Sequence, residues 1–437
     1  MKKQENDVME KIVSLCKRRG FIYQGSEIYG GLAGTWDYGP LGVTLKNNIK
    51  NLWWKKFVDN STDMYGVDAA LLMNPKVWEA SGHVGGFADP LVECKKCKRR
   101  FRADHLENKE KCPECEGELG EEKQFNMMFK TSVGASQDES SVSYLRPETA
   151  QGMFVNFKNV LDSFHPRLPF GLAQIGKAFR NEIAPRDFIF RTREFEQMEI
   201  EYFVREADWK KEFEKWREEM ISWMKLIGLS EKNIHELEVE GNDLAHYSKR
   251  TIDFEYDFPF GRKELYGLAY RTDFDLKNHS EASGTDLSYY DEESKERFTP
   301  HVIEPTFGVD RTVLAVLSEA YTEDELGGEG ETRVYLKLPA HIAPIKVAVF
   351  PLLKNKPALI EKAKEVFAQL KATYGAVVFD DNGNIGKRYR RQDEIGTPYC
   401  VTVDFDTLED DTVTVRDRDT GKQSRVKISE LSEAIKI

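Results

Sequence analysis

Four cysteines arranged as two Cys-x-x-Cys pairs form the most specific chemical pattern in the chain. Cys94 pairs with Cys97 and Cys112 pairs with Cys115, with fourteen residues between the two pairs. Four thiolates at this spacing can occupy the corners of a tetrahedron at about 2.3 Å from Zn²⁺, and a closed set of four protein ligands is typical of a structural site. The spacing therefore predicts one structural zinc ion; the alternative is four unrelated reduced thiols.

Charged and aromatic residues follow two segments whose alternation predicts strands, residues 171–182 and 193–204. Side chains two positions apart leave the same face of a strand, so Arg180 and Glu182 share a face. The second segment has one polar and one apolar face, on which Phe195, Gln197, Glu199 and Glu201 alternate with Met198, Ile200 and Tyr202. The pattern predicts an antiparallel hairpin with a core face and a polar face.

The polar face of this hairpin has two interpretations. It can be the solvent-facing side of an antiparallel sheet. It can also be a binding platform, because Arg186, Arg191 and Arg193 of the connecting loop suit an anionic ligand. These three arginines favour a binding platform.

Residues 304–311 predict a strand that runs into a helix. Gly308 permits the close approach of a ligand, and Arg311 lies in the first helical turn, where unpaired backbone N–H groups favour a phosphate. Arginine can make two parallel hydrogen bonds to a phosphate. Residues 171–178 also have the glycine and lysine spacing of a phosphate-binding loop. Such a loop needs the hydroxyl of a Ser or Thr at the position of Ala178, so we reject that match.

These candidate residues need a framework of helices and strands. In the first part of the chain the pattern predicts a helix ending at Arg19, a helix opened by Pro40 and a helix over 209–229. It predicts strands over 251–260 and 267–274. Residues 30–42 are rich in glycine, and the charged residues 92–124 are predicted to be an insertion. Beyond a glycine-rich segment at 327–330, strand and helix patterns alternate from 345 to 403, which predicts a small sheet with parallel strands. We place a domain boundary near Leu338.

The composition is typical of a soluble protein with two or three domains. The chain has 437 residues, a net charge of −12 and 40% hydrophobic residues. No apolar run approaches the roughly 20 residues of a membrane span, and the charged N-terminus lacks a secretory signal, so we expect a cytoplasmic protein. Lys387, Arg388, Arg390 and Arg391 flank Tyr389, and this cluster is either a contact for a polyanion or a solvated loop.

Taken together, the motifs resemble those of the homodimeric glycyl-tRNA synthetases, which are class II aminoacyl-tRNA synthetases. The matching segments are residues 30–42, 145–152, 179–182, 193–199 and 308–311. The resemblance implies an α+β catalytic domain on an antiparallel sheet over residues 1–338, with a zinc-ribbon-like insertion at 92–124, and a C-terminal α/β anticodon-binding domain over 339–437. It also implies a homodimer that uses ATP with Mg²⁺, glycine and tRNA(Gly).

The resemblance assigns the binding of ATP to residues around the hairpin. It implies that Arg180 holds the α-phosphate, that Phe195 stacks on adenine and that Arg311 binds the γ-phosphate, with Arg180, Glu182 and Arg311 as the catalytic residues. Glu264 is expected to help bind ATP and its Mg²⁺. The implied ATP site consists of Arg180, Asn181, Glu182, Phe190, Arg191, Thr192, Arg193, Glu194, Phe195, Glu264, Leu265, Gly308, Val309, Asp310 and Arg311.

The resemblance also assigns a glycine site. It implies that Glu148, Glu199 and Glu304 bind the ammonium group and that Arg271 faces the carboxylate, with Arg102 favoured over Arg100 as a further contact. The implied site consists of Arg102, Glu148, Phe195, Glu196, Gln197, Met198, Glu199, Arg271, Glu304, Pro305, Thr306, Phe307 and Gly308. Members of the family usually have Ser where this chain has Thr306. An extra methyl group tightens a pocket that already excludes larger side chains, so we expect selection of glycine to survive. Because such a pocket rejects larger amino acids by steric overlap, we expect no editing domain.

Two other functions stay open. A non-catalytic relative would serve as a nucleic-acid-binding accessory subunit, and such a protein is expected to lose its ATP ligands. This chain retains Arg180, Glu182, Phe195, Glu264 and Arg311, which favours an active enzyme. A zinc-ribbon protein that binds nucleic acid would explain residues 92–124 but not the other motifs.

Overall fold

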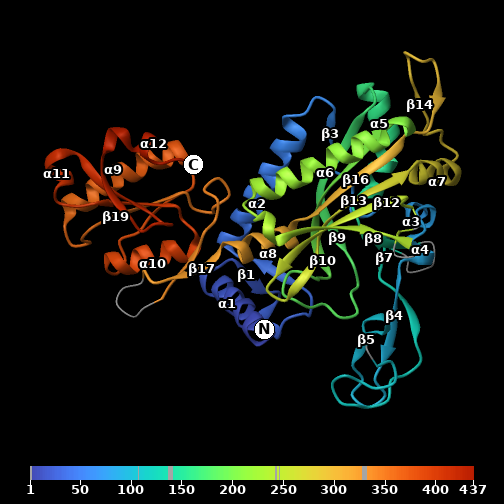
Figure 1. Cartoon of the computed structure of the whole chain (residues 1–437), viewed down its shortest axis with the longest axis horizontal. Coiled ribbons are helices and arrows are strands. Elements are labelled where there is room, and N and C mark those ends of the chain that lie inside the picture. Colours follow the sequence, from blue (N-terminus) through green and yellow to red (C-terminus); the bar gives the residue numbers. More distant parts are fainter. Residues whose placement is uncertain (1, 107, 136–140, 242–243, 246, 327–331) are drawn as a thin grey trace.

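The protein folds into two units of unequal size (Figure 1). A computed structural model describes residues 2–106, 108–135, 141–241, 244–245, 247–326 and 332–437, so the glycine-rich segment at 327–330 lies outside the described residues. The larger unit is built on a broad sheet and the smaller unit holds the C-terminal residues. A narrow extension that contains β4 (Ala88–Glu93) and β5 (Arg100–Arg102) projects from the larger unit.

Within the described residues, the central sheet has seven strands in the order β11, β12, β13, β16, β10, β9, β3. Their bounds are Ile234–Val239, Arg250–Phe258, Gly261–Thr272, His301–Gly308, Glu194–Val204, Phe170–Phe179 and Met64–Gly66. Neighbouring strands are antiparallel except β3 and β9. The pairing of β9 with β10 confirms the predicted hairpin, but the expected end of its first strand is wrong: β9 ends at Phe179, so Arg180 and Glu182 lie in the connecting loop. The bounds predicted for the strand over 267–274 are wrong at both ends. Strand β13 starts at Gly261 and ends at Thr272, and helix α7 (Phe274–Ser283) follows it.

The two faces of the sheet differ as the alternation over 193–204 predicts. Met198, Ile200 and Tyr202 are buried in the main hydrophobic core, whereas Phe195 and Glu199 line a cavity on the other face. Helices α2 (Pro40–Trp54), α6 (Trp209–Leu226) and α8 (Val309–Ala320) are among those that contribute to this core (Figure 1). The expected helix at Pro40 is confirmed, with proline at a position that needs no backbone N–H.

A second hydrophobic cluster supports the segment that carries Glu148, just before helix α5. Helix α5 (Ala150–Phe164) begins two residues after Glu148 and shares this cluster with α7. Phe157 of α5 packs against Phe203 of β10, with 4.6 Å between their ring centres. The segment that carries Glu148 is thereby fixed against the same strands that carry the polar platform.

The insertion forms a small sheet of its own, in the order β5, β4, β6 (Lys123–Asn126). The strands begin at Ala88 and end at Asn126, so the expected bounds of 92–124 omit both edges. Residues 88–91 contain no cysteine and one charged residue, and for this reason composition did not mark them. The cysteines belong to the hydrophobic cluster of this sheet.

The C-terminal unit contains the predicted alternation of strands and helices. Strands β20 (Val377–Phe379), β19 (Val347–Pro351) and β21 (Tyr399–Val403) are parallel and are connected through α9 (Pro357–Tyr374) and α10 (Ile385–Ile395). Two antiparallel strands that the sequence analysis did not predict, β22 (Thr412–Asp417) and β23 (Gln423–Lys427), extend the sheet. This unit has a separate hydrophobic cluster.

Helix α1 (Lys2–Arg19) ends where the sequence predicts and connects the two units. Arg19 forms an ion pair with Glu394 of α10, and Arg18 lies 3.5 Å from the same carboxylate. The shorter elements of the chain are β1 (Ile22–Gln24), β2 (Trp36–Tyr38), α3 (Pro75–Ala80), α4 (His83–Gly86), β7 (Phe129–Ser132), β8 (Val142–Leu145), β14 (Tyr289–Tyr290), β15 (Arg297–Phe298), β17 (Tyr321–Asp324), β18 (Arg333–Leu336), α11 (Thr407–Asp410) and α12 (Leu431–Ala434). In the part of the chain that the structure describes, no helix has the length and apolar character needed to cross a membrane.

Candidate active site

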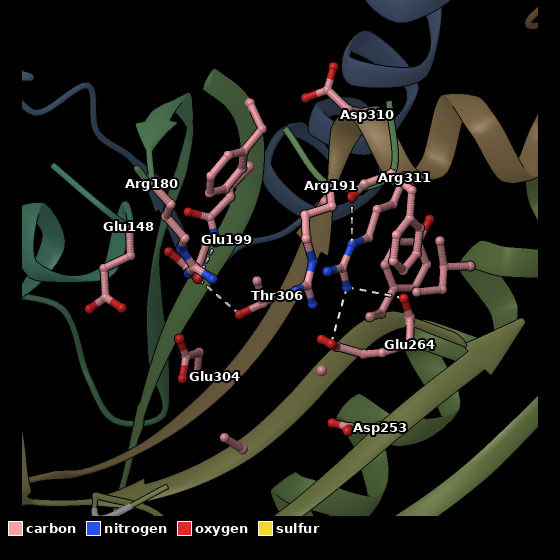
Figure 2. A pocket seen from close by; sticks show the side chains of 18 of the residues that line it. Glu148, Arg180, Arg191, Glu199, Asp253, Glu264, Glu304, Thr306, Asp310 and Arg311 are labelled. Atoms are coloured by element: carbon pink, nitrogen blue, oxygen red, sulfur yellow. Dashed lines mark hydrogen bonds and ion pairs between the residues drawn. The ribbon is translucent and has the colours of Figure 1, made fainter. Parts of the chain in front are cut away.

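The polar face of the central sheet carries a cavity of about 440 Å³. Most residues that the resemblance assigns to ATP or glycine line it: Arg102, Glu148, Arg180, Glu182, Phe190, Arg191, Thr192, Phe195, Glu196, Gln197, Glu199, Glu264, Leu265, Glu304, Thr306, Gly308, Asp310 and Arg311. Figure 2 shows two chemically different ends, with carboxylates around Thr306 at one and Arg191, Arg311 and Glu264 at the other. One cavity thus unites residues from segments far apart in the sequence.

Arg311 and Glu264 lie together at the cationic end. Arg311 Nη1 is 3.1 Å from Glu264 Oε2, and it donates a hydrogen bond of 3.0 Å to the backbone oxygen of Glu264. The guanidinium group also lies 4.4 Å from the centre of the Phe190 ring. The charge of Arg311 lowers the pKa of Glu264, so this carboxylate is ionised at neutral pH. An anionic ligand with a divalent cation would find partners for both charges here.

Arg180 lies beside an aromatic platform. Its Nε donates a hydrogen bond of 3.1 Å to the backbone oxygen of Pro147. Its guanidinium carbon is 5.3 Å from the ring centre of Phe87 and 5.3 Å from that of Phe195. A guanidinium held in this way can bind a phosphate while the neighbouring ring accepts a base.

Glu199 occupies the carboxylate end of the cavity. Its side chain accepts hydrogen bonds from the hydroxyls of Thr149 and Thr306, and the second of these measures 2.9 Å. Gln197 Nε2 lies 3.4 Å from the same oxygen that Thr306 contacts. These donors orient the carboxylate and place the Thr306 side chain next to it at the cavity wall.

Glu148 and Glu304 complete this end and differ in their ionisation. Burial alone would raise the pKa of Glu148, but His83, whose Nε2 is 3.3 Å from Glu148 Oε2, and Arg271 hold that pKa well below its usual range. Burial raises the pKa of Glu304 to about 8 against the opposing charge of Arg271, and the neighbouring carboxylates of Glu199 and Glu148 add to the rise. Glu148 is therefore a fixed negative charge, whereas Glu304 titrates near neutral pH.

Arg271 lies behind the cavity and not on its wall. Its side chain is 1% exposed, and it binds Asp275 through Nε at 2.8 Å and Nη2 at 2.9 Å. Its Nη1 donates a hydrogen bond of 2.8 Å to Glu304. The resemblance places this arginine opposite the carboxylate of glycine. In this structure it instead fixes the position of Glu304.

Four apolar residues of the implied site face away from the cavity. Met198, Phe307 and Val309 belong to the main core, and Pro305 is buried on the same strand as Phe307. Strand alternation explains the first two, since their neighbours Gln197, Glu199 and Thr306 occupy the cavity face. These side chains stabilise the fold and do not line the binding surface.

Three polar residues of the implied site also lie outside the cavity. Arg193 donates hydrogen bonds to the backbone oxygens of Ala33 and Glu182, at 2.7 and 3.0 Å, and so ties the hairpin to the glycine-rich segment. Glu194 forms an ion pair with Lys177, and Asn181 shares a separate surface hollow with Glu194. Glu196 lines the cavity, but its carboxylate binds two lysines of α2, Lys46 at 2.9 Å and Lys50 at 2.8 Å.

Asp253 and Tyr247 are among the cavity residues that were not predicted. Asp253 lies on β12, and burial together with the carboxylates of Glu264 and Glu255 raises its pKa to about 7. The alternation of Thr251, Asp253 and Glu255 with apolar residues is the signal that would have indicated this position. Tyr247, whose ring centre is 3.8 Å from the Arg271 guanidinium, comes from a segment with no regular pattern.

The four predicted zinc ligands converge in the insertion. Cys94 Sγ is 3.5 Å from Cys115 Sγ, Cys97 Sγ is 3.7 Å from Cys112 Sγ, and the four sulfurs lie within 4.8 Å of one another. Sulfurs at about 2.3 Å from one zinc ion would be roughly 3.8 Å apart, so the donor set fits tetrahedral Zn²⁺. Arg102 at the end of β5 lines the main cavity and binds Asp89 at 2.6 Å, whereas the exposed Arg100 pairs with Glu93 outside it.

The basic cluster on α10 is largely structural. Arg388 is buried and donates to the backbone oxygens of Asp381 and Gly383, at 2.9 and 2.8 Å. Arg391 binds Asp380 at 2.6 Å. Lys387 is the exposed member of the cluster, so a contact surface for a polyanion is smaller here than the sequence suggests.

Comparison with known proteins gives consistent results for both units. Residues 129–320 match the class II core domain of tRNA synthetases for G, H, P, S and T, and residues 346–436 match the anticodon binding domain. The chain is 53% identical to the glycine–tRNA ligase of Alkaliphilus oremlandii, with 97% of each chain covered. It is 52% identical to that of Clostridium acetobutylicum, with 98% of each chain covered, and 51% identical to that of Bacillus anthracis, with 97% covered. The chain therefore belongs to the glycine–tRNA ligase family of class II aminoacyl-tRNA synthetases.

Proposed function

We propose that this protein attaches glycine to tRNA(Gly) in two steps. In the first, an oxygen of the glycine carboxylate attacks the α-phosphorus of ATP, and pyrophosphate leaves as glycyl-adenylate forms. In the second, a terminal ribose hydroxyl of the tRNA takes the glycyl group and AMP leaves. The observation that supports this most directly is the single cavity with Arg191 and Arg311 at one end and three carboxylates at the other, which matches a nucleoside triphosphate next to a small ammonium compound.

In the activation step we assign three residues to ATP. Arg180 would neutralise charge on the α-phosphate, Phe195 would stack on adenine, and Arg311 would bind the γ-phosphate. Such a reaction depends on positioning and charge stabilisation and needs no protein nucleophile. The hydrogen bond from Arg180 to Pro147 and the contact of Arg311 with Phe190 support these roles, since both guanidinium groups are held in place before ATP binds.

Glu264 is our candidate for the Mg²⁺ ion that accompanies ATP. Its carboxylate is ionised and lies beside Arg311, where the terminal phosphates would be. Asp253 lines the same region of the cavity. Carboxylates and phosphate oxygens together are the usual ligands of Mg²⁺ in nucleotide sites.

Glycine would bind at the acidic end. Glu148, Glu199 and Glu304 offer negative charge to its ammonium group, and a buried cation requires such partners. Thr306 lies against Glu199 and narrows the space available for a side chain. Arg102 of the insertion supplies a cation at the cavity wall.

The test is exchange of labelled pyrophosphate into ATP, with glycine, alanine and serine in separate reactions. We expect exchange with glycine alone and without tRNA. Folded, zinc-loaded protein that gives no exchange with any of the three would indicate the accessory-subunit function instead.

We further propose a structural zinc ion and a cytoplasmic homodimer. The convergence of Cys94, Cys97, Cys112 and Cys115 supports the metal, and a bound Zn²⁺ would hold the insertion together. The dimer is supported by exposed apolar side chains just before the glycine-rich segment, where Ile28 is 89% and Tyr29 is 87% exposed. Sedimentation of the parent and of Ile28→Glu tests the dimer, since a monomeric parent would contradict it.

A further inference from the structure

Glu201 is a buried carboxylate that none of the assigned roles uses. It lies on β10, two residues after Glu199, and is 0% exposed. Among the residues that the structure describes, neither of its oxygens has a hydrogen-bond partner. A carboxylate without a donor in such a place is costly, because burial removes the water that would stabilise its charge.

The neighbours of Glu201 make an isolated negative charge still less favourable. Carboxylate oxygens of Glu199, Glu201 and Glu304 lie within 4.8 Å of one another. The strand pairs on either side, Glu199 with Thr306 and Tyr202 with Ile303, place Glu201 opposite Glu304. Like charges directly opposite each other on paired strands are destabilising.

The charged groups around Glu201 come from four elements. Glu199 lies on β10, Glu304 on β16, Arg271 on β13 and Asp275 on α7. Arg271 already binds Asp275 twice and Glu304 once. Burial, and then the carboxylate of Glu304, raise the pKa of Glu201 well above its usual range despite Arg271.

We propose that Glu201 is a positioning residue of the glycine subsite, held as a neutral carboxylic acid whose O–H donates a hydrogen bond to the carboxylate of Glu304. This rests on the proposed binding of glycine at the acidic end. Glu304 is the acceptor because it faces Glu201 across the strands, whereas both oxygens of Glu199 already accept hydrogen bonds from threonine hydroxyls. With glycine bound, Glu201 and Glu304 together hold one proton and one negative charge.

Neutrality of Glu201 has a consequence for binding. Two ionised carboxylates facing each other would repel and turn apart, whereas an acid and a carboxylate attract and hold one geometry. Glu304 is then held from behind by Arg271 and from the side by Glu201. The ammonium group of glycine meets a carboxyl group whose position is already fixed.

Three variants test the proposal in the full-length, zinc-loaded protein. Glu201→Gln is neutral, has the same shape and can donate an N–H to Glu304, so we expect the KM for glycine to stay within about threefold of the parent value. Glu201→Leu fills the space without a donor, and we expect its KM for glycine to rise at least about tenfold with the KM for ATP unchanged. Glu304→Gln removes the charge itself and should raise the KM for glycine at least as much.

The outcomes separate the alternatives. If Glu201→Gln raises the KM for glycine as much as Glu201→Leu does, an ionised carboxylate is needed at this position. If Glu201→Leu leaves the KM for glycine unchanged, Glu201 only fills space. Either result overturns the proposal. Infrared spectra of unliganded protein at about pH 9, roughly one unit above the Glu304 pKa, give a readout apart from activity. We expect a protonated-carboxyl band that Glu201→Gln lacks. Parent protein without glycine-dependent exchange would instead contradict the proposed function.

Discussion

The hydroxyl of Tyr38 donates a 2.5 Å hydrogen bond to Asp310, a residue 272 positions further along the chain. Asp310 also accepts a hydrogen bond of 2.8 Å from the backbone N–H of Glu196 and lies 3.3 Å from Lys46 Nζ. The glycine-rich region, helix α2, strand β10 and the start of helix α8 therefore meet at one carboxylate. Arg311 is the next residue, so this junction fixes the arginine at the cationic end of the cavity.

Replacing Tyr38 with Phe removes one hydrogen bond from this junction. A hydrogen bond to a charged group contributes about 1.5–3 kcal/mol, so we expect the free energy of unfolding to fall by a similar amount. We also expect the KM for ATP to rise several-fold, because Arg311 loses its fixed position. Denaturant titration and pyrophosphate exchange measure these effects, and Tyr290→Phe, at an exposed position of β14, is the control. Unchanged stability and KM in Tyr38→Phe would contradict the role of the junction.

Arg180→Ala tests charge stabilisation at the α-phosphate. Loss of a preorganised charge stabiliser costs at least about 2.7 kcal/mol in the activation barrier. Glycine-dependent pyrophosphate exchange measures this step directly. Lys177→Ala, three residues earlier in the chain, is exposed and outside the cavity and should retain the parent rate. If the exchange rate of Arg180→Ala stays within threefold of the parent rate, another residue must stabilise the charge on the α-phosphate.

The KM for glycine should depend on pH through Glu304. The pKa of this group is about 8, so its carboxyl is mostly protonated in the free enzyme at neutral pH, and ammonium binding requires the ionised form. We expect the KM for glycine to fall as the pH rises from about 6 to 8, by up to about tenfold per unit, and then to level off. Glu304→Gln should have a higher KM that varies less with pH over this range.

The same pKa predicts how stability changes. The pKa of Glu304 rises from 4.5 in the unfolded chain to about 8 in the fold, so protonation favours the folded state. This contribution is fully present below pH 4.5 and is lost as the pH rises towards 8 and above it. Comparing the unfolding of the unliganded parent and of Glu304→Gln at each pH isolates the effect, and a constant difference would contradict it.

Thr306→Ser should weaken discrimination against alanine. The serine hydroxyl can still donate to Glu199, but the lost methyl group leaves space for a small side chain. One methylene changes binding by about 1–3 kcal/mol, so we expect the ratio of kcat/KM for glycine to that for alanine to fall by roughly tenfold or more. Exchange assays with each amino acid measure the ratio. An unchanged ratio would place the discriminating contact elsewhere.

Removal of zinc should impair the active site from a distance. Arg102 reaches the cavity from the sheet that the four cysteines hold together. We expect about one Zn²⁺ per chain by metal analysis, loss of activity after chelation and recovery when zinc is added. Cys97→Ser should lose the metal, whereas Cys400→Ser, at a buried cysteine of the C-terminal unit, should retain it. Full activity in metal-free protein would contradict this link.

Local pattern predicted the parts of the site that lie on regular strands. The alternation through Phe195, Gln197 and Glu199 correctly separated the cavity face from the core face, because strand geometry fixes the direction of each side chain. The position of Arg271 behind Glu304 could not be predicted. It depends on Asp275, which lies on the helix after β13, and on the pairing of β13 with β16, which joins residues far apart in the sequence.

Charge in the sequence was a weaker guide than strand pattern. Arg388 and Arg391 appear as a basic cluster in the sequence, yet their guanidinium groups bind backbone oxygens and Asp380 in the fold. The same holds for Arg193, which ties the hairpin to the glycine-rich segment. An arginine serves either the fold or a ligand, and the choice depends on the tertiary contacts around it.

The acidic end of the cavity affects the stability of the enzyme without its substrate. Glu148, Glu199 and Glu304 lie close together, and Arg271 behind them is already bound to Asp275. The proposed binding of glycine would add an ammonium group to these carboxylates, besides the contacts that His83 and Arg271 already make with Glu148 and Glu304. A ligand that binds only the folded state stabilises it in proportion to the logarithm of its concentration. The amino acid that the enzyme consumes therefore also stabilises the enzyme against unfolding. A cell short of glycine would have less substrate and also a smaller fraction of folded enzyme.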